Sequence, residues 1–138
     1  MNGEGVNPNF RTLKRRANEL AATTCADEDA QALLFFYAAE CALKALYMLT
    51  YSLKVTSDCT TVLASAQSFG HRLDQLISTL KIAPKEVPPR PTTLRLRTGV
   101  SINVNHLHEA WRYGEKIQNH AEAVAWLNKI IAFVTARL

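Results

Sequence analysis

One carboxylate stands out because its helical neighbours are apolar. Glu40 shares a helical stripe with Phe36, Leu43 and Tyr47. Lys44 follows one turn later, in the favourable acid-before-base order. Burying a carboxylate without a partner is costly. Two interpretations are open: an intrahelical ion pair at the edge of a core, or a polar group kept inside for a functional site.

The remaining residues with metal-binding or nucleophilic chemistry lack the spacing that such sites need. His106 and His108 form a His-x-His pair, which faces one side only in an extended chain, and Glu109 is the carboxylate beside them. The three cysteines, Cys25, Cys41 and Cys59, have no metal-ligand spacing and are expected to be reduced thiols. The sequence has no Gly-rich phosphate loop. We therefore expect neither a metal nor a cofactor.

Composition is typical of one globular domain spanning residues 1–138. The chain is 48% hydrophobic and 20% charged, which excludes a disordered protein. Its net charge of +4 is compatible with an anionic partner such as RNA. The beginning, MNGEGVNPNF, has no signal-peptide pattern, and no run approaches the roughly 18 apolar residues that span a bilayer. A cytoplasmic protein without membrane contact is expected.

Residues 27–54 are expected to form one long central helix. No Gly or Pro interrupts them, and Thr24 with Asp27 resembles a capping box at the start. The main apolar stripe comprises Ala32, Phe35, Ala39, Ala42, Leu46, Leu49 and Leu53. A second stripe, containing Leu33 and Glu40, widens the apolar arc, so the helix should lie between several others.

Four further helices are predicted around it. The first runs from Pro8 to Ala22, capped by Asn7, and is antiparallel to the long helix because the connection is short. The third begins at Gly70 and ends before Pro84; the fourth spans about 105–114; the last runs from the Asn119 cap, with Glu122, to Leu138. The inward residues are Phe10, Leu13, Ala17, Leu20, Leu73, Leu76, Ile77, Leu80, Leu107, Ala110, Trp111, Ala123, Leu127, Ile130, Ile131, Val134 and Leu138.

The connecting segments are less regular. Residues 56–70 read equally well as a loop or a brief helix, and the proline-rich residues 83–91 as a loop or extended arm. Apolar and polar residues alternate over 93–104, which predicts a β-hairpin with a three-residue loop at 97–99. Leu96 then opposes Val100, and Leu94 opposes Ile102. The fold class is all-α, an antiparallel bundle of four to five helices with a short hairpin inserted.

Basic side chains gather in two places. Arg11, Lys14, Arg15 and Arg16 lie on the outward side of the first helix, and Arg95 and Arg97 lie on the hairpin. Each group is either a solvated face or a nucleic-acid contact.

Three segments occur in an order that resembles a known family. They are AAECALKAL at 38–46, GHRLDQL at 70–76 and HEAWRYGEK at 108–116. Together they are similar to the HEPN domain, a small helical-bundle family of prokaryotic defence and toxin–antitoxin systems. Glu40, Lys44, Gly70, His71, Leu73, Leu76, Arg112 and Tyr113 take the family's characteristic places.

The resemblance implies a bundle that commonly dimerises and, in catalytic members, cleaves RNA without metal. Such members use an arginine followed by four to six residues and a histidine. Here seven residues separate Arg112 from His120, which departs from that pattern. Metal-free cleavage needs a base of near-neutral pKa and a fixed cation, roles that His120 and Arg112 would take, beside Tyr113, Glu40 and Lys44. His71 is either a local structural histidine or reaches the level of Glu40 and Lys44.

The alternatives to these catalytic roles are structural. His120 follows the expected cap and could be an exposed first-turn histidine, and Arg112 could stack on an adjacent aromatic ring. The sequence thus supports three functions: a HEPN-like metal-independent endoribonuclease, a non-catalytic HEPN-like RNA-binding module, or a helical adaptor for a protein. The expected partners are a second copy in a homodimer, RNA, and a nucleotidyltransferase-like or antitoxin protein.

Overall fold

The molecule is built on one long helix, α2 (Glu28–Thr50). A computed structural model describes residues 6–91 and 94–138. The predicted uninterrupted helix is confirmed, with two corrected ends. Asp27, not Thr24, is the cap, because its side chain accepts a hydrogen bond from the Ala30 amide at 2.8 Å. The helix ends before Lys54, and Ser52 has a positive φ of 57° in the turn that follows.

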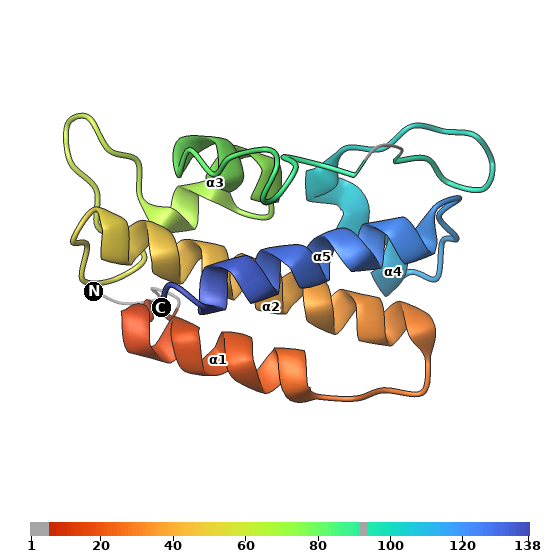
Figure 1. Cartoon of the computed structure of the whole chain (residues 1–138), viewed down its shortest axis with the longest axis horizontal. Coiled ribbons are helices and arrows are strands. Elements are labelled where there is room, and N and C mark those ends of the chain that lie inside the picture. Colours follow the sequence, from red (N-terminus) through yellow and green to blue (C-terminus); the bar gives the residue numbers. More distant parts are fainter. Residues whose placement is uncertain (1–5, 92–93) are drawn as a thin grey trace.

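The described residues form an all-α bundle around α2, as predicted. Helix α1 runs antiparallel to α2 on one side, α5 lies along it on another, and α3 and α4 lie over a third (Figure 1). Helix α5 runs in the same direction as α2, since the two helices begin at the same end of the bundle (Figure 1). The bounds are α1 (Phe10–Ala22), α3 (Leu73–Thr79), α4 (Leu107–Arg112), α5 (His120–Thr135) and the 3-10 helices η1 (Ala66–Phe69) and η2 (Val104–His106).

Helix α1 begins two residues later than predicted. Its cap is Asn9, whose side chain accepts from the Thr12 amide at 2.9 Å. Asn7 is used elsewhere, donating to the Ser57 hydroxyl at 2.7 Å and accepting from the Thr56 hydroxyl at 2.8 Å. A tertiary contact with the segment after α2 therefore takes the side chain that local pattern assigned to the cap.

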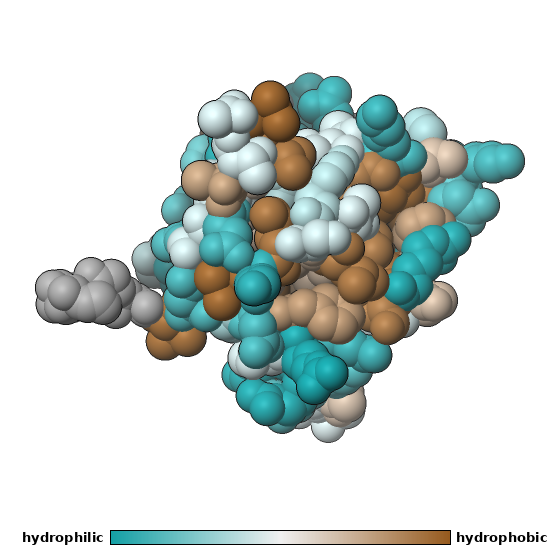
Figure 2. Space-filling view, turned by 90° about the vertical axis from the view of Figure 1, so that its left-hand side faces the viewer, coloured by the Kyte–Doolittle hydropathy of each residue, from teal (hydrophilic) through white to brown (hydrophobic). Residues whose placement is uncertain are grey.

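The helices bury most of the residues expected to face inward, but α2 is rotated from the predicted stripe. Phe36 is fully buried, whereas Phe35 is half-buried and Leu49 is 47% exposed. Ala39 and Ala42 of the predicted stripe are buried as expected, and so is Leu43 of the second stripe. At the end of the bundle where α2 finishes, apolar side chains gather between hydrophilic ones (Figure 2). The second stripe is thus nearer the centre of the core than the first.

The later helices are shorter than predicted. Helix α3 ends at Thr79, ahead of Lys81 with its φ of 58°, and so stops before Pro84. Helix α4 begins at Leu107 after η2 and stops before Gly114, whose φ is 74°. Helix α5 ends at Thr135, and Asn119 caps it without a side-chain hydrogen bond. The open choice over 56–70 is resolved as a loop that ends in η1.

The predicted hairpin register is confirmed, although no strand is assigned over 94–138. The Leu96 amide donates to Val100 at 2.8 Å and the Ile102 amide donates to Leu94 at 3.0 Å. Gly99 closes the loop with a φ of 97°, which favours glycine. A bridge from Leu96 to Ile117 adds a third segment. Thr93, where the predicted hairpin begins, lies outside the described residues.

Helix α2 is long and apolar enough to cross a membrane by length and composition alone. This corrects the expectation that no stretch reaches that length. Half of its most apolar 18-residue stretch is buried inside the bundle. Buried core helices of soluble proteins reach the same length and hydropathy. The helix is thus weak support for a membrane span.

Candidate functional site

The polar face at the middle of α2 is organised by Glu40. Its carboxylate accepts from Lys44 Nζ at 3.0 Å and contacts His71 Nδ1 at 2.7 Å. The Glu40 and Lys44 side chains are only 14% and 12% exposed, whereas His71 is 41% exposed. The predicted intrahelical pair is confirmed, and it is joined by a histidine from another part of the chain. Glu40 is therefore paired within the fold on both of its oxygens.

His71 is presented by a tight turn that requires glycine. Gly70 has φ 56° and ψ −123°, the first central position of a type II′ turn, and the Arg72 amide donates back to Phe69 at 3.0 Å. The Arg72 guanidinium also donates to the Ser68 and Phe69 carbonyls at 2.6 and 3.1 Å. These bonds fix the turn, so His71 is held against Glu40 before any ligand binds.

The tautomer of His71 follows from its partner. An ionised carboxylate only accepts hydrogen bonds, so Nδ1 carries the proton and donates to Glu40. In the neutral ring Nε2 then keeps its lone pair. A partly exposed histidine oriented by a carboxylate in this way is a suitable general base.

Helix α4 brings two further side chains to the same place. His108 and Arg112 are one turn apart and share a face of the helix. The His108 ring centroid lies 4.0 Å from that of His71, and Arg112 Nη2 donates to the Tyr37 hydroxyl at 2.6 Å. The Tyr37 ring is 6.3 Å from both histidine rings. We call this group the histidine–arginine cluster: Tyr37, Glu40, Lys44, His71, His108 and Arg112.

The charged members of the cluster lie on two helices, with Glu40 and Lys44 on α2 and Arg112 on α4. The hydrogen bond to Tyr37 raises the pKa of the exposed Arg112 above its ordinary value, so the guanidinium is a fixed cation. Tyr113, 73% exposed, lies with its ring 6.0 Å from the Arg112 guanidinium. Beside Glu40, burial raises the pKa of the Cys41 thiol to about 11, so this thiol is no nucleophile. The arrangement offers an accessible base and an accessible cation.

His108 is the buried member. It is 4% exposed, and its Nδ1 has no hydrogen-bond partner among residues 6–91 and 94–138. Burial, then the neighbouring His71 and Arg112, lower the pKa of His108 below 6.5. A neutral imidazole is thus packed against Phe36, with ring centroids 5.3 Å apart.

The lowered pKa of His108 predicts a pH-dependent stability. Below pH 6.5 the unfolded chain binds a proton that folded His108 does not, so the free energy of unfolding should fall as pH drops and level off below the folded-state pKa. His108→Leu should remove this component between pH 7 and 5. Urea denaturation across that range measures it, with exposed His106→Leu as the control. Equal pH slopes for wild type and His108→Leu would contradict the assignment.

His120 belongs to a different group of side chains. Trp111 Nε1 donates to His120 Nδ1 at 3.1 Å. The ligand atoms of Glu28, Asp29 and His120 lie within 4.8 Å of one another, and Asp29 is paired with Lys116 at 2.9 Å. Because the indole only donates, Nδ1 must accept and the neutral ring carries its proton on Nε2. In this tautomer neither ring nitrogen has a free lone pair, which does not fit metal ligation.

The structure brings together some predicted site residues and separates others. Glu40, Lys44 and Arg112 enter the cluster, and Tyr113 lies beside Arg112, whereas His120 bonds to Trp111.

The basic residues predicted to contact nucleic acid are dispersed. Lys14 donates to the Leu138 carbonyl at 3.1 Å, and Arg15 faces Glu19 at 4.0 Å. Arg11, Arg95 and Arg97 are exposed.

Sequence reasoning missed Tyr37 and His108 as members of the site. Helical spacing was the available signal. Tyr37 precedes Glu40 by three residues, and His108 precedes Arg112 by four, so each shares a face with a residue already singled out.

No protein-family model, curated protein or solved structure matches this chain. Membership of the HEPN family therefore stays a prediction that rests on the three short segments.

Proposed function

We propose that this protein is a HEPN-like metal-independent endoribonuclease of a prokaryotic defence or toxin–antitoxin system. The supporting observation is that the three segments of the resemblance meet at one place, contributing Glu40 with Lys44, His71, and His108 with Arg112. Residues widely separated in sequence thus form one acid–base and cationic group, in which His71 and Arg112 are the accessible members. The proposal includes a homodimer and an antitoxin-like or nucleotidyltransferase-like partner, in line with the resemblance, and the cytoplasmic location expected from the sequence.

In this mechanism His71 is the general base, in place of His120. Nε2 of His71 takes the proton from a ribose 2′-hydroxyl, whose oxygen attacks the adjacent phosphorus. Arg112 stabilises the negative charge that builds on the phosphate oxygens, and Glu40 orients the ring and stabilises the imidazolium. Tyr37 positions Arg112 through the 2.6 Å hydrogen bond. Attack breaks the bond from phosphorus to the 5′-oxygen, which takes a proton from water, and leaves a cyclic 2′,3′-phosphate.

Cleavage of single-stranded RNA in EDTA tests the proposal. Wild type is expected to cut the RNA, and Arg112→Ala to lower the rate by about 10²–10³-fold, since a charge-stabilising donor is lost. Arg16→Ala is the matched control because it removes an exposed arginine from α1. Gel analysis of end-labelled RNA measures the rate. An inactive wild type would end the enzymatic proposal, as would equal loss in both variants.

The alternative is a non-catalytic HEPN-like RNA-binding protein. A cleft lined by Arg72, Arg90 and Arg95 favours it, because arginines at a cleft offer phosphate contacts without requiring cleavage. Salt-sensitive RNA binding by a wild-type protein that never cuts would support this alternative over the first.

A further inference from the structure

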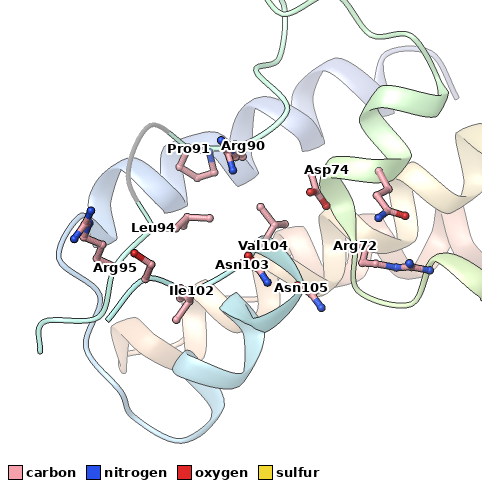
Figure 3. A pocket seen from close by; sticks show the side chains of 12 residues that line it. Arg72, Asp74, Arg90, Pro91, Leu94, Arg95, Ile102, Asn103, Val104 and Asn105 are labelled. Carbon is pink, nitrogen blue, oxygen red and sulfur yellow. The ribbon is translucent and has the colours of Figure 1, made fainter. Parts of the chain in front are cut away.

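A cleft of about 580 Å³ opens between the start of α3, the hairpin and η2. Asp74 comes from α3, Arg72 lies just before it with its guanidinium turned away from the cleft, and Arg90 and Arg95 come from the segments before and within the hairpin (Figure 3). Two asparagines line it from the chain around η2. The asparagines are Asn103 and Asn105. Three arginines and one aspartate give the lining a net positive charge, which makes this cleft attractive to an anion.

Its arginines differ in how they are held. Arg72 is fixed by its bonds to the Ser68 and Phe69 carbonyls. Arg90 and Arg95 are exposed, and neither side chain has a hydrogen bond or ion pair with the described part of the chain. Their charge is therefore available to a ligand.

The other basic surface is a weaker site by comparison. On α1, Arg15 and Arg16 face Glu19 at 4.0 and 3.4 Å, and Lys14 donates to the Leu138 carbonyl. An incoming phosphate would have to compete with these contacts. The cleft, not α1, is the favoured place for a nucleic-acid phosphate.

The cleft is lined by residues that are near neighbours, along the chain, of two members of the histidine–arginine cluster. Arg72 follows His71 in the same type II′ turn, and Asn105 precedes His108 by three residues. Helices α3 and η2, which lie on either side, contact each other. An RNA bound at His71 would thus have its neighbouring nucleotide near Arg72, at the edge of the cleft.

The lining also indicates what lies beside the phosphate. Leu94 and Ile102 offer an apolar surface, and the amides of Asn103 and Asn105 offer both donors and acceptors. Asp74 would repel a ligand that carries only phosphate but accepts hydrogen bonds from N–H groups. A nucleobase satisfies all three features, as bases of single-stranded RNA are bound by stacking and by hydrogen bonds at their edges.

We propose that this cleft binds one nucleotide of single-stranded RNA next to the nucleotide that is cut. Arg90 and Arg95 hold its phosphates, Leu94 and Ile102 pack against the base, and the asparagines with Asp74 contact its edge. This inference rests on the proposed function for the position of the cut, but the binding itself does not require cleavage.

Fluorescence anisotropy with a short single-stranded RNA tests the cleft in EDTA. Binding is measured in the His71→Ala protein, so that cleavage does not interfere. Adding Arg90→Ala and Arg95→Ala should weaken binding about tenfold or more and lower the slope of log K against log salt by about 1.4, or 0.7 for each phosphate contact. Adding Arg15→Ala and Arg16→Ala instead removes the same charge from α1 and should change binding by less than about threefold.

Equal weakening by the two double variants, or no weakening by the cleft variant, would overturn the inference. Competition identifies the ligand class: a 5′-mononucleotide should displace the RNA at a lower concentration than inorganic phosphate, and equal displacement would overturn the base contact. A wild type that binds through the cleft but cuts no RNA would contradict the proposed function alone. A wild type that cuts RNA while the cleft variant binds normally would contradict this inference alone.

Discussion

RNA cleavage is expected to fall by about 10²–10⁴-fold when His71 is replaced by alanine, because the general base is removed. His71 Nδ1 is held by Glu40 at 2.7 Å, its side chain is 41% exposed, and its ring lies in the same cluster as Arg112. The lost hydrogen bond to Glu40 should lower the free energy of unfolding by about 1–2 kcal/mol, because Lys44 still pairs the carboxylate. The expected rate loss therefore reflects chemistry, and circular dichroism checks that the variant is folded.

His120→Ala is the matched control for this experiment. His120 Nδ1 accepts from Trp111, and the ring lies by Glu28 and Asp29, so it is engaged away from Glu40 and His71. Cleavage should remain within about threefold of wild type, while the lost hydrogen bond should lower stability by about 1 kcal/mol. If His120→Ala abolished cleavage and His71→Ala did not, the base would be the one that the family spacing suggested.

The largest loss of stability is expected from Phe36→Ala, at about 3–5 kcal/mol in the free energy of unfolding. Phe36 is 0% exposed, and its ring lies 5.3 Å from His108 and 6.0 Å from Tyr37. Truncation would leave a cavity beside the rings of His108 and Tyr37, two members of the cluster. Urea denaturation at constant pH measures the change.

Phe35→Ala is its control, since the two residues are adjacent and identical in type. Phe35 is only half-buried, so less apolar area is lost and a smaller change of about 1–2 kcal/mol is expected. A larger loss for Phe35 than for Phe36 would show that the stripe predicted from sequence, not the rotated one, faces the core.

The sequence pattern was sufficient to predict those features that depend only on residues close together in the chain. The unbroken run of α2, the inward face of α3 at Leu73, Leu76 and Ile77, and the break at Gly114 depend on helical periodicity and on backbone freedom. The hairpin register is also local, because Gly99 can take the positive φ that a three-residue loop needs, and the loop length sets which residues oppose each other. Lys44 reaches Glu40 because residues four apart are neighbours on any helix.

Tertiary contacts decided the rest. Asn7 leaves the cap of α1 for Ser57, and α2 rotates to bury Phe36 in place of Phe35, because partners distant in sequence take those positions. The spacing between Arg112 and His120 was equally uninformative. Consecutive helical residues point about 100° apart, so Trp111 faces His120 while Arg112 faces Tyr37.

By itself, then, the sequence determined an all-α chain with a paired Glu40 on a long central helix, since these depend on neighbours within one turn. Only the tertiary structure decided which histidine accompanies that pair. His71 meets Glu40 because a glycine turn and the packing of η1 and α3 on α2 bring together residues thirty-one positions apart. The hydrophobic periodicity of a single helix carries no information on which distant residue contacts it.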